Sequence, residues 1–323
     1  MKRLGNVFDD IVDLKNLKLA FYKAQKRKAY RKDIIKFRNN FDVNISLLRE
    51  ELLLDKYKPS KYRKFIIKRP KERLISAAAF RDRIVHHAII NICEDRFEKH
   101  LINQCCACRK SKGTDHAVNI AKSFRNPWYL KLDIHKYFNS IQHAQLLKVL
   151  TRLFKDNRLL SLFELIIKSY STSEGKGLPI GNLTSQYFAN TFLSSLDHYI
   201  KETLKCKEYV RYMDDFVLCG ASNQQLKGWL EKIKIKLEEI GLCLNNPILN
   251  RLSHGFPFLG YRFSYGNVRL SLRIKKNFRE RLKQANYNAD YGLWDAMEYK
   301  SHVSPIMAHL KRANYKEFFL VVN

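Results

Sequence analysis

The stretch Tyr209-Val-Arg-Tyr-Met-Asp-Asp-Phe-Val-Leu-Cys219 places two adjacent carboxylates, Asp214 and Asp215, between two apolar runs. Runs rich in Val, Tyr, Phe and Leu, split by a polar pair, predict two short buried strands that meet at a tight turn. Both acids would lie at the tip, where they repel each other and lose hydration unless a cation neutralises them. A hard divalent ion with oxygen ligands, such as Mg2+, is the natural partner. A solvated Asp-Asp turn is the alternative interpretation.

A third carboxylate, Asp133, ends the stretch Trp128-Tyr-Leu-Lys-Leu-Asp133, in which apolar and polar residues alternate as they do in a strand. One acid on a neighbouring strand, together with the hairpin pair, would make a three-carboxylate site. Such a site can bridge two metal ions held about 3.5–4 Å apart for in-line displacement at phosphorus. The two stretches together therefore predict a phosphoryl-transfer centre.

The composition narrows the class of protein. With 323 residues, 46% of them hydrophobic, the chain is long enough for a globular fold with a substantial core. Its 60 Lys and Arg against 31 Asp and Glu give a formal net charge of +29, which indicates a polyanionic partner. An anionic membrane is the alternative to nucleic acid, but the aromatic residues are spread along the chain rather than gathered on one basic amphipathic helix.

Membrane and disulfide classes are disfavoured. No apolar run approaches the roughly 20 residues that a membrane span requires, and no secretory h-region follows the basic start. Seven Cys, an odd number, favour a reducing compartment. Cys105-Cys106-Ala-Cys108 raises zinc as an alternative, but no second Cys or His pair follows at finger spacing, which favours buried thiols beside a strand.

The spacing Asp133-x-x-x-Tyr137-Phe138, followed by Tyr-Met-Asp-Asp, resembles the palm of reverse transcriptases. This resemblance implies an α+β right-hand polymerase with fingers, a palm built of an antiparallel sheet with helices, and a helical thumb. The expected boundaries are 1–129 for the fingers with an N-terminal helical extension, 130–262 for the palm, and 263–323 for the thumb. Residues from about 142 to 180 would be helices associated with the fingers.

The resemblance also implies the catalytic group. Asp133, Asp214 and Asp215 would be the catalytic acids, and they would bind two Mg2+ ions together with Ile134; Mn2+ is the alternative ion. In this arrangement Asp133 ligates both metals, Asp214 is the second strong ligand, and Asp215 is weaker or supporting.

A basic turn, Lys71-Glu-Arg73, is expected to join two strands of a fingers hairpin, and a helix would begin near Asp82 with that side chain as its N-cap. In reverse transcriptases the cations of this hairpin grip the triphosphate of the incoming nucleotide. Arg73 is the first candidate and Lys71 the second, because bidentate guanidinium geometry suits phosphate. A surface cation is the alternative for Arg73.

Phe138 matches the steric gate of the family by its spacing from Asp133, and Tyr137 is the adjacent candidate. A bulky ring beneath the sugar leaves no room for a 2′-OH and so selects deoxynucleotides. A core aromatic is the alternative for either ring.

The block Ile180-Gly181-Asn-Leu-Thr-Ser185-Gln186 is similar to the pattern of reverse transcriptases from diversity-generating retroelements. Many reverse transcriptases carry Gln where this chain has Ile180, and group II intron enzymes usually end the block in Ser-Pro. Ile180 and Gly181 are therefore expected beside the nascent base pair. Loss of a hydrogen-bonding amide should lower discrimination between nucleotides, since specificity needs differential contacts. The adenine bias of the errors is implied by the resemblance alone.

Phe258-Leu259-Gly260 matches the turn that grips the primer end, and Gly260 permits close backbone approach. No Lys stands between Asn245 and Asn250, so the acid that protonates pyrophosphate is left unassigned. An apolar stripe flanked by Lys and Arg in residues 274–283 predicts a thumb helix facing duplex phosphates.

Taken together, the resemblance implies an RNA-directed DNA polymerase, a nucleotidyltransferase that copies a template-repeat RNA into adenine-mutagenised cDNA during mutagenic retrohoming. Its implied partners are that RNA, the cDNA primer-template, dNTPs, and a small basic helical accessory protein that forms a pentameric barrel. We expect a cytoplasmic enzyme of a bacterium, archaeon or phage, with no membrane partner. The alternatives are a group II intron-type reverse transcriptase and a non-catalytic RNA-binding scaffold.

Overall fold

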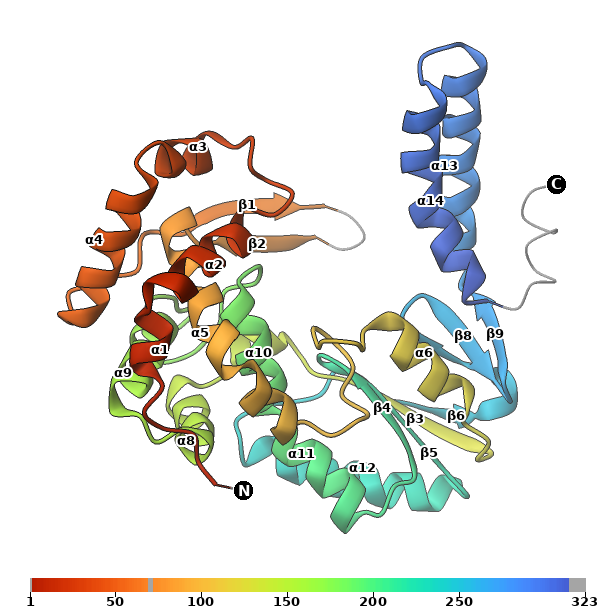
Figure 1. Ribbon diagram of the computed structural model, residues 1–323. Helices are drawn as coiled ribbons and strands as arrows, with labels where there is room; N and C mark the ends of the chain where they lie inside the picture. Colours follow the sequence, from red (N-terminus) through yellow and green to blue (C-terminus); the bar gives the residue numbers. More distant parts are fainter. Residues whose placement is uncertain (1, 69–71, 314–323) are drawn as a thin grey trace. The chain divides into compact units, whose positions relative to one another are not determined.

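The computed structural model describes residues 2–68 and 72–313 (Figure 1). The chain divides into two compact units, each of which is described by itself. The first unit comprises the residues up to Ile102, His135–His198 and Lys236–Cys243, and the second comprises Asn103–Ile134, Tyr199–Ile235 and the residues from Leu244 onward. Within the described ranges, no helix combines the length and the apolar character needed to cross a membrane. The expected division into fingers, palm and thumb stays a prediction.

Helices dominate the first unit. The pair α2 (Leu14–Gln25) and α5 (Phe80–His100) packs through apolar side chains at helical spacing, including the fully buried Leu17 and Ala20 of α2. Asp13 caps α2, because its side chain accepts hydrogen bonds from the backbone N–H groups of Lys15 and Asn16. The other helices of this unit are α1 (Phe8–Val12), α3 (Lys32–Asn39), α4 (Phe41–Leu53), α7 (Tyr137–Ser140), α8 (His143–Leu153), α9 (Asn157–Lys168), α10 (Leu183–Phe192) and α11 (Ser194–His198).

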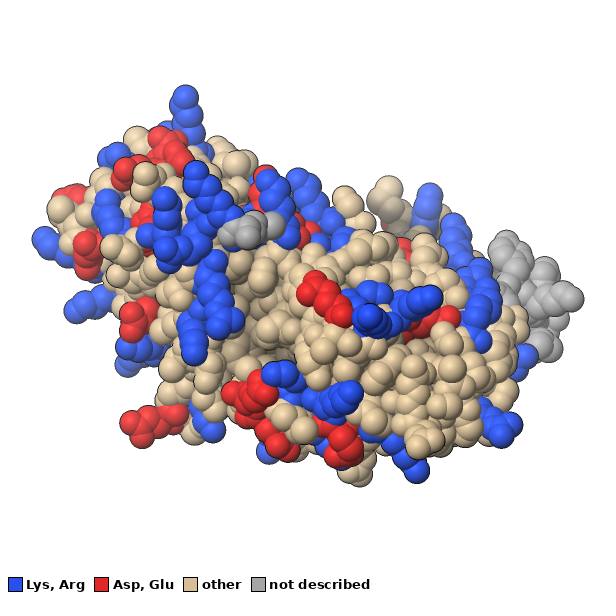
Figure 2. All heavy atoms as spheres, turned by 90° about the horizontal axis from the view of Figure 1, so that it is seen from below, with Lys and Arg blue, Asp and Glu red and all other residues tan. Residues whose placement is uncertain are grey.

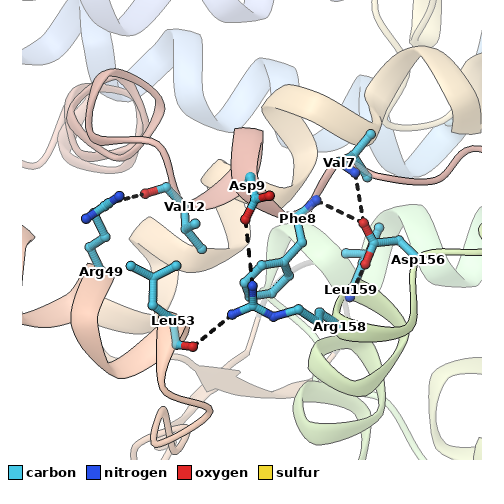
Figure 3. Close-up of polar contacts among 9 residues, drawn as sticks. All are labelled: Val7, Phe8, Asp9, Val12, Arg49, Leu53, Asp156, Arg158 and Leu159. Atoms are coloured by element: carbon cyan, nitrogen blue, oxygen red, sulfur yellow. Dashed lines mark hydrogen bonds and ion pairs between the residues drawn. The ribbon is translucent and has the colours of Figure 1, made fainter.

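Within the first unit, two charged side chains at the start of α9 hold the N-terminal helix α1 in place (Figure 3). The carboxylate of Asp156 accepts hydrogen bonds from the backbone N–H groups of Val7 and Phe8, at 2.8 and 3.0 Å, and also caps α9 itself. The guanidinium of Arg158 lies 4.0 Å from the centre of the Phe8 ring and donates to the carbonyl of Leu53, the last residue of α4. Asp156 and Arg158 thereby tie α1, α4 and α9 together.

The predicted fingers hairpin is present in the first unit. Strands β1 (Arg63–Ile67) and β2 (Arg73–Ala77) pair antiparallel, with Ile67 opposite Arg73. All of β1 is exposed, whereas Ser76 near the end of β2 is buried and donates its backbone N–H to the carbonyl of Ile180 at 3.0 Å. The buried end of the hairpin is therefore anchored beside the loop that leads into α10.

The expectation that Asp82 caps α5 is wrong. The helix begins at Phe80, its N-cap position is Ala79, and Asp82 lies inside the first turn. The Asp82 carboxylate is buried and accepts hydrogen bonds from the Tyr57 hydroxyl and the Ser60 backbone N–H, both at 2.9 Å. The Asp82 carboxylate thus bonds to two residues of an earlier segment instead of to the backbone N–H groups of its own helix.

A four-stranded antiparallel sheet in the order β4-β5-β3-β6 forms the centre of the second unit. Its strands are β3 (Trp128–Asp133), β4 (Glu208–Tyr212), β5 (Asp215–Gly220) and β6 (Ile248–Arg251). The buried run of β5, from Phe216 to Gly220, fits a central strand covered on both faces. Apolar residues of α6 (Thr114–Lys122), such as Ala117 and Val118, share one buried cluster with Tyr129 and Val217 of the sheet.

A second, three-stranded sheet continues that buried cluster. It consists of β7 (Phe256–Phe258), β8 (Tyr261–Ser264) and β9 (Asn267–Leu270), and its rings of Phe256 and Phe263 stack with centroids 5.2 Å apart. The remaining elements are α12 (Asn223–Glu238), α13 (Leu272–Asp290), α14 (Ala296–Lys311), the π-helical turn Tyr199–Thr203 and the 3-10 turn Leu252–His254. Phe278 of α13 is buried in the cluster and Ile274 and Leu282 pack against it, so the apolar stripe predicted for this helix is confirmed.

Candidate active site

The predicted acidic hairpin is present in the second unit. β4 ends at Tyr212 and β5 begins at Asp215, and these two residues are paired across the strands. Met213 and Asp214 form the two-residue connection, and Met213 has a left-handed φ of +59°. The hairpin therefore presents its two acids at the tip, as the sequence pattern predicts.

The third acid lies at the same end of the sheet. β3 and β5 run antiparallel in a register that sets Asp133 directly opposite Asp215. The backbone N–H of Ile134 donates to the carbonyl of Asp214 at 3.2 Å. The fold thus brings together the four residues expected to bind metal: Asp133, Ile134, Asp214 and Asp215.

Two further side chains contact these acids and were missed at the sequence level. Nζ of Lys131 lies 2.5 Å from Oδ1 of Asp215. Nδ2 of Asn245 donates to Oδ2 of Asp133 at 2.6 Å, and its backbone N–H donates to the Asp133 carbonyl at 2.8 Å. The period of two along β3 puts Lys131 on the same face as Asp133, a signal that could have identified it.

The electrostatics of the group follow from partial burial. Desolvation raises the pKa of the Asp215 carboxyl to about 6; Lys131 opposes this shift, and the neighbouring charges of Asp133 and Asp214 add to it. The negative charges of Asp133 and Asp214 therefore oppose ionisation of Asp215. A bound cation would relieve that repulsion, which the single ammonium of Lys131 relieves only in part.

The donor chemistry of the site fits a hard divalent ion, since carboxylate and backbone carbonyl oxygens are the ligands that such ions prefer. In residues 2–68 and 72–313, however, no three carboxylate, imidazole or thiol groups already converge as a metal-binding set. Asp215 is instead turned to Lys131, and Asp133 to Asn245. Each bond engages one oxygen of its carboxylate, so an ion would bind through the other oxygen while Lys131 and Asn245 hold the groups in place.

The candidate steric-gate residues lie in the first unit and have different surroundings. Tyr137 is 1% exposed, and its hydroxyl donates to the carbonyl of Ala189 at 2.5 Å, so this ring is part of the core. Phe138 is only partly buried, and its ring meets Tyr137 edge-on with centroids 5.7 Å apart. Of the two rings, Phe138 is the more available for contact with a sugar.

The loop before α10 holds the other first-unit candidates. Ile180 is partly exposed, and Gly181 adopts a φ of +110°, where an added Cβ would lie 2.8 Å from Cγ2 of Ile75. Asn182 is buried; its side chain accepts from Ala78 N–H and donates to the Ser76 carbonyl, both at 3.0 Å. The loop is thereby clamped to the end of β2.

Of the two expected triphosphate contacts, Arg73 begins β2 and is exposed, and Lys71 lies outside the described residues.

The expected primer-grip residues form a tight turn in the second unit. Phe258 is buried, whereas Leu259 and Gly260 connect β7 to β8 with φ values of +51° and +85°. Positive φ at both central residues is the geometry of a hairpin turn that matches strand twist. The carbonyl of Gly260 accepts from the N–H of Ser271, the N-cap residue of α13, at 2.9 Å, which fastens the turn to that helix.

An antiparallel sheet that carries acids at the facing ends of adjacent strands, with helices before and after it in the chain, is the arrangement expected for the palm of a nucleic acid polymerase. The model of the reverse transcriptase (RNA-dependent DNA polymerase) family matches residues 58–263, more than half of the chain. The chain belongs to this family. It is accordingly an RNA-directed DNA polymerase with an α+β right-hand fold, as the sequence predicts, and the family acts on an RNA template and nucleotides with divalent metal ions.

Individual relatives are distant. Protein YkfC of Escherichia coli (strain K12) is 25% identical over 283 residues, which cover 71% of this chain and 74% of YkfC. The putative COX1/OXI3 intron 1 protein of Saccharomyces cerevisiae is 26% identical over 169 residues, 49% of this chain and 20% of that protein. The structure of apo telomerase from Candida tropicalis, truncated from its C-terminal domain, aligns with a TM-score of 0.49 and 13% identity over 70% of this chain and 60% of telomerase. The chain thus spans about a fifth of the intron protein and three fifths of that telomerase chain.

Proposed function

We propose that this reverse transcriptase belongs to a diversity-generating retroelement and copies a template-repeat RNA into cDNA with frequent errors opposite adenine. The observation that carries the proposal is the aliphatic Ile180 in a loop whose backbone is held in place. The Ile180 carbonyl accepts a hydrogen bond from the backbone N–H of Ser76. Two residues further on, the side chain of Asn182 forms hydrogen bonds with the backbone at the end of β2. A rigid loop that presents an alkyl group offers no amide with which to test the geometry of a base pair.

A basic cavity borders the same loop and supports contact with a nucleic acid strand. Its volume is about 550 Å3, and Gly181 and Asn182 form part of its wall. The cations that line it are Lys28, Arg31, Lys32, Arg63 and Arg83. Burial, and secondarily the charge of Arg31, lowers the pKa of the Arg83 guanidinium, whereas Asp33, the acid that lines the same cavity, opposes this shift. Phosphate groups of the template strand are the partner that this charge pattern fits.

The charge of the whole molecule agrees with an extended polyanionic partner. The net charge is +29, and Lys and Arg side chains stand in several groups on the face that Figure 2 shows. The proposed partners are the template-repeat RNA with its cDNA, dNTPs, and a small basic helical accessory protein that forms a pentameric barrel. Because that protein would also be cationic, the shared RNA is the proposed mediator of their association.

For catalysis we propose two Mg2+ ions, or Mn2+ in their place, held by Asp133, Ile134, Asp214 and Asp215. Bound there, the ions would supply charge stabilisation to the attacking and leaving oxygens. The chain's own groups orient those ligands: Asn245 holds Asp133, and Lys131 holds Asp215. Phe138 is proposed as the steric gate, Arg73 and Lys71 as triphosphate contacts, and Phe258, Leu259 and Gly260 as the primer grip.

The test is primer extension on an RNA template with all four dNTPs, followed by sequencing of the product. The native enzyme is expected to accumulate errors opposite template adenine, and Ile180→Gln should reduce them several-fold while extension continues. Asp214→Asn, the control for the chemistry, should abolish extension. An Ile180→Gln variant with the native error spectrum would count against the role of this loop.

A group II intron-type reverse transcriptase is the second candidate, favoured by the similarity to a protein named for a COX1 intron. That function predicts few errors at every template base. Accurate copying by the native chain would therefore support the intron-type enzyme. Extension that persists in Asp214→Asn would contradict the proposed role of Asp214 in either enzyme.

A further inference from the structure

Arg211 of β4 is fully buried, with 0% of its surface exposed, although arginine is rarely placed in a protein core. Its Nη1 donates to the carbonyl of Met213 at 2.9 Å, and its Nη2 donates to Sγ of Cys105 at 3.2 Å. The guanidinium thus spans from the turn of the acidic hairpin to a thiol of a different segment.

The backbone of Arg211 is fixed from that same segment. Its N–H donates to the carbonyl of Gln104, and its carbonyl accepts from the N–H of Cys106, both at 2.9 Å. Gln104–Cys106 therefore runs alongside β4 as a short parallel bridge centred on Cys105 and Arg211. With main chain and guanidinium both bonded, this side chain has little freedom to point elsewhere.

The group that Arg211 holds is the strained part of the hairpin. Met213 adopts a φ of +59°, a conformation that non-glycine residues other than Asn and Asp visit rarely. The Met213 carbonyl belongs to the peptide group that enters Asp214, and the Asp214 carbonyl accepts from the N–H of Ile134 at 3.2 Å. Arg211 thus donates a hydrogen bond to the peptide group before Asp214, and Ile134 donates one to the peptide group after it.

We propose that Arg211 is a positioning residue that sets the direction of the Asp214 carboxylate for metal binding by fixing the left-handed turn at Met213. Cys105 contributes to this positioning because its sulfur accepts the hydrogen bond from Nη2 and so orients the guanidinium. A planar fork with several N–H donors can serve the carbonyl and the thiol at once, which an ammonium cannot do in the same geometry. This inference rests on the proposed role of Asp214 as a metal ligand.

The first experiment measures Mn2+ binding to the purified full chain by electron paramagnetic resonance, without substrate. Arg211→Met should weaken Mn2+ binding about 10-fold or more, the size of effect that follows loss of groups orienting metal ligands. Arg211→Lys should fall between that variant and the native chain. In primer extension, the Mg2+ concentration for half-maximal rate should rise in parallel, with the KM for primer-template unchanged.

A rescue variant separates positioning from mere packing. Asn tolerates positive φ better than Met, so Met213→Asn should recover several-fold of the Mn2+ affinity lost in Arg211→Met. Cys105→Ala should weaken binding by a smaller factor and Cys105→Ser should restore it, since the hydroxyl keeps an acceptor. Cys106→Ala, a change of the same size at the next residue, is the control and should bind Mn2+ as the native chain does.

The outcomes distinguish this inference from the function on which it rests. Native Mn2+ affinity in folded Arg211→Lys and Cys105→Ala, together with weakened binding in Asp214→Asn, would overturn the positioning role alone. Native affinity in Asp214→Asn would instead overturn the role of Asp214 as a metal ligand. If Arg211→Met does not fold, as circular dichroism would reveal, Arg211→Lys and Cys105→Ala still decide the question.

Discussion

Asn245 holds Asp133 at two points, with its side-chain amide 2.6 Å from Oδ2 and its backbone N–H 2.8 Å from the carbonyl. Asn245→Ala would keep the backbone bond and remove the bond to the carboxylate, which would then be free to rotate. We expect kcat for primer extension to fall about 10- to 100-fold, as it does when a group that orients a metal ligand is lost. Steady-state extension at saturating dNTP measures this change.

The matched control for Asn245→Ala is Asn250→Ala. Asn250 lies in β6, and its side-chain oxygen bonds to the neighbouring backbone of Arg251 and to His254 rather than to an acid of the site. This variant should retain kcat within about twofold, since surface changes of this kind have small effects. Equal losses in the two variants would show that the effect comes from the folding of this region and not from Asp133.

Nζ of Lys131 forms an ion pair with Oδ1 of Asp215 at 2.5 Å, and the Lys131 side chain is 15% exposed. Lys131→Met would leave a partly buried carboxylate beside Asp133 and Asp214, so the free energy of unfolding should fall by about 2 kcal/mol in the absence of metal. Saturating Mg2+ should restore more stability to this variant than to the native chain, because the ion would replace the lost positive charge. Urea denaturation with and without Mg2+ measures both quantities.

Lys148→Met provides the comparison for Lys131→Met, because Lys148 is exposed on α8. It should change neither the stability nor the response to Mg2+. If Mg2+ raised the free energy of unfolding of Lys131→Met no more than that of Lys148→Met, the Lys131 ammonium would not supply positive charge that a bound ion can replace.

The acids of the site were predictable from sequence because each lies in a short local pattern: an alternating strand ending at Asp133 and an apolar hairpin around Asp214. Their partners were not, since Asn245 meets Asp133 across 112 residues of chain and Cys105 meets Arg211 across 106. The same cause explains the wrong N-cap at Asp82, whose carboxylate bonds to Tyr57 and Ser60. Local propensity identifies the elements, whereas contacts between distant segments decide how their polar groups are used.

Gly181 should not tolerate a side chain. At its φ of +110°, Gly181→Ala would be strained, and the new Cβ would lie 2.8 Å from Cγ2 of Ile75. We expect a loss of about 2 kcal/mol in the free energy of unfolding, the usual cost of such backbone strain. Ile75→Leu, which removes the branch at Cβ, should recover part of the loss by relieving the contact but not the strain.

Gly228→Ala in α12 is the opposite case. Apart from its chain neighbours and the backbone of its own helix, no described residue has a heavy atom within 4 Å of a Cβ added here. Because alanine also favours helix, this variant should be stabilised by up to about 1 kcal/mol. Thermal unfolding of both glycine variants, followed by circular dichroism, makes the comparison. Destabilisation of similar size at the two positions would argue against a special requirement at Gly181.

His86 makes the stability of the protein depend on pH. It is 2% exposed on α5, and its Nδ1 has no hydrogen-bond partner among the described residues. Burial, with the nearby charges of His87 and Arg83, lowers the pKa of this imidazole from 6.5 to about 3. Between those two pH values the unfolded chain binds a proton that the folded chain does not, so stability falls as the pH decreases, by up to about 1.4 kcal/mol per pH unit.

Replacing His86 with a side chain that does not titrate should flatten that dependence. His86→Leu is expected to lose about 1.6 kcal/mol less than the native chain between pH 6.5 and pH 5, because the unfolded imidazole is half protonated at pH 6.5 and the slope reaches its full value only at lower pH. His302→Gln, at an exposed position of α14, should leave the native slope unchanged. Urea denaturation followed by far-UV circular dichroism at each pH supplies the free energies. Identical slopes for His86→Leu and the native chain would mean that the pKa of this imidazole is the same in the folded and the unfolded chain, so that its burial on α5 does not exclude the charge.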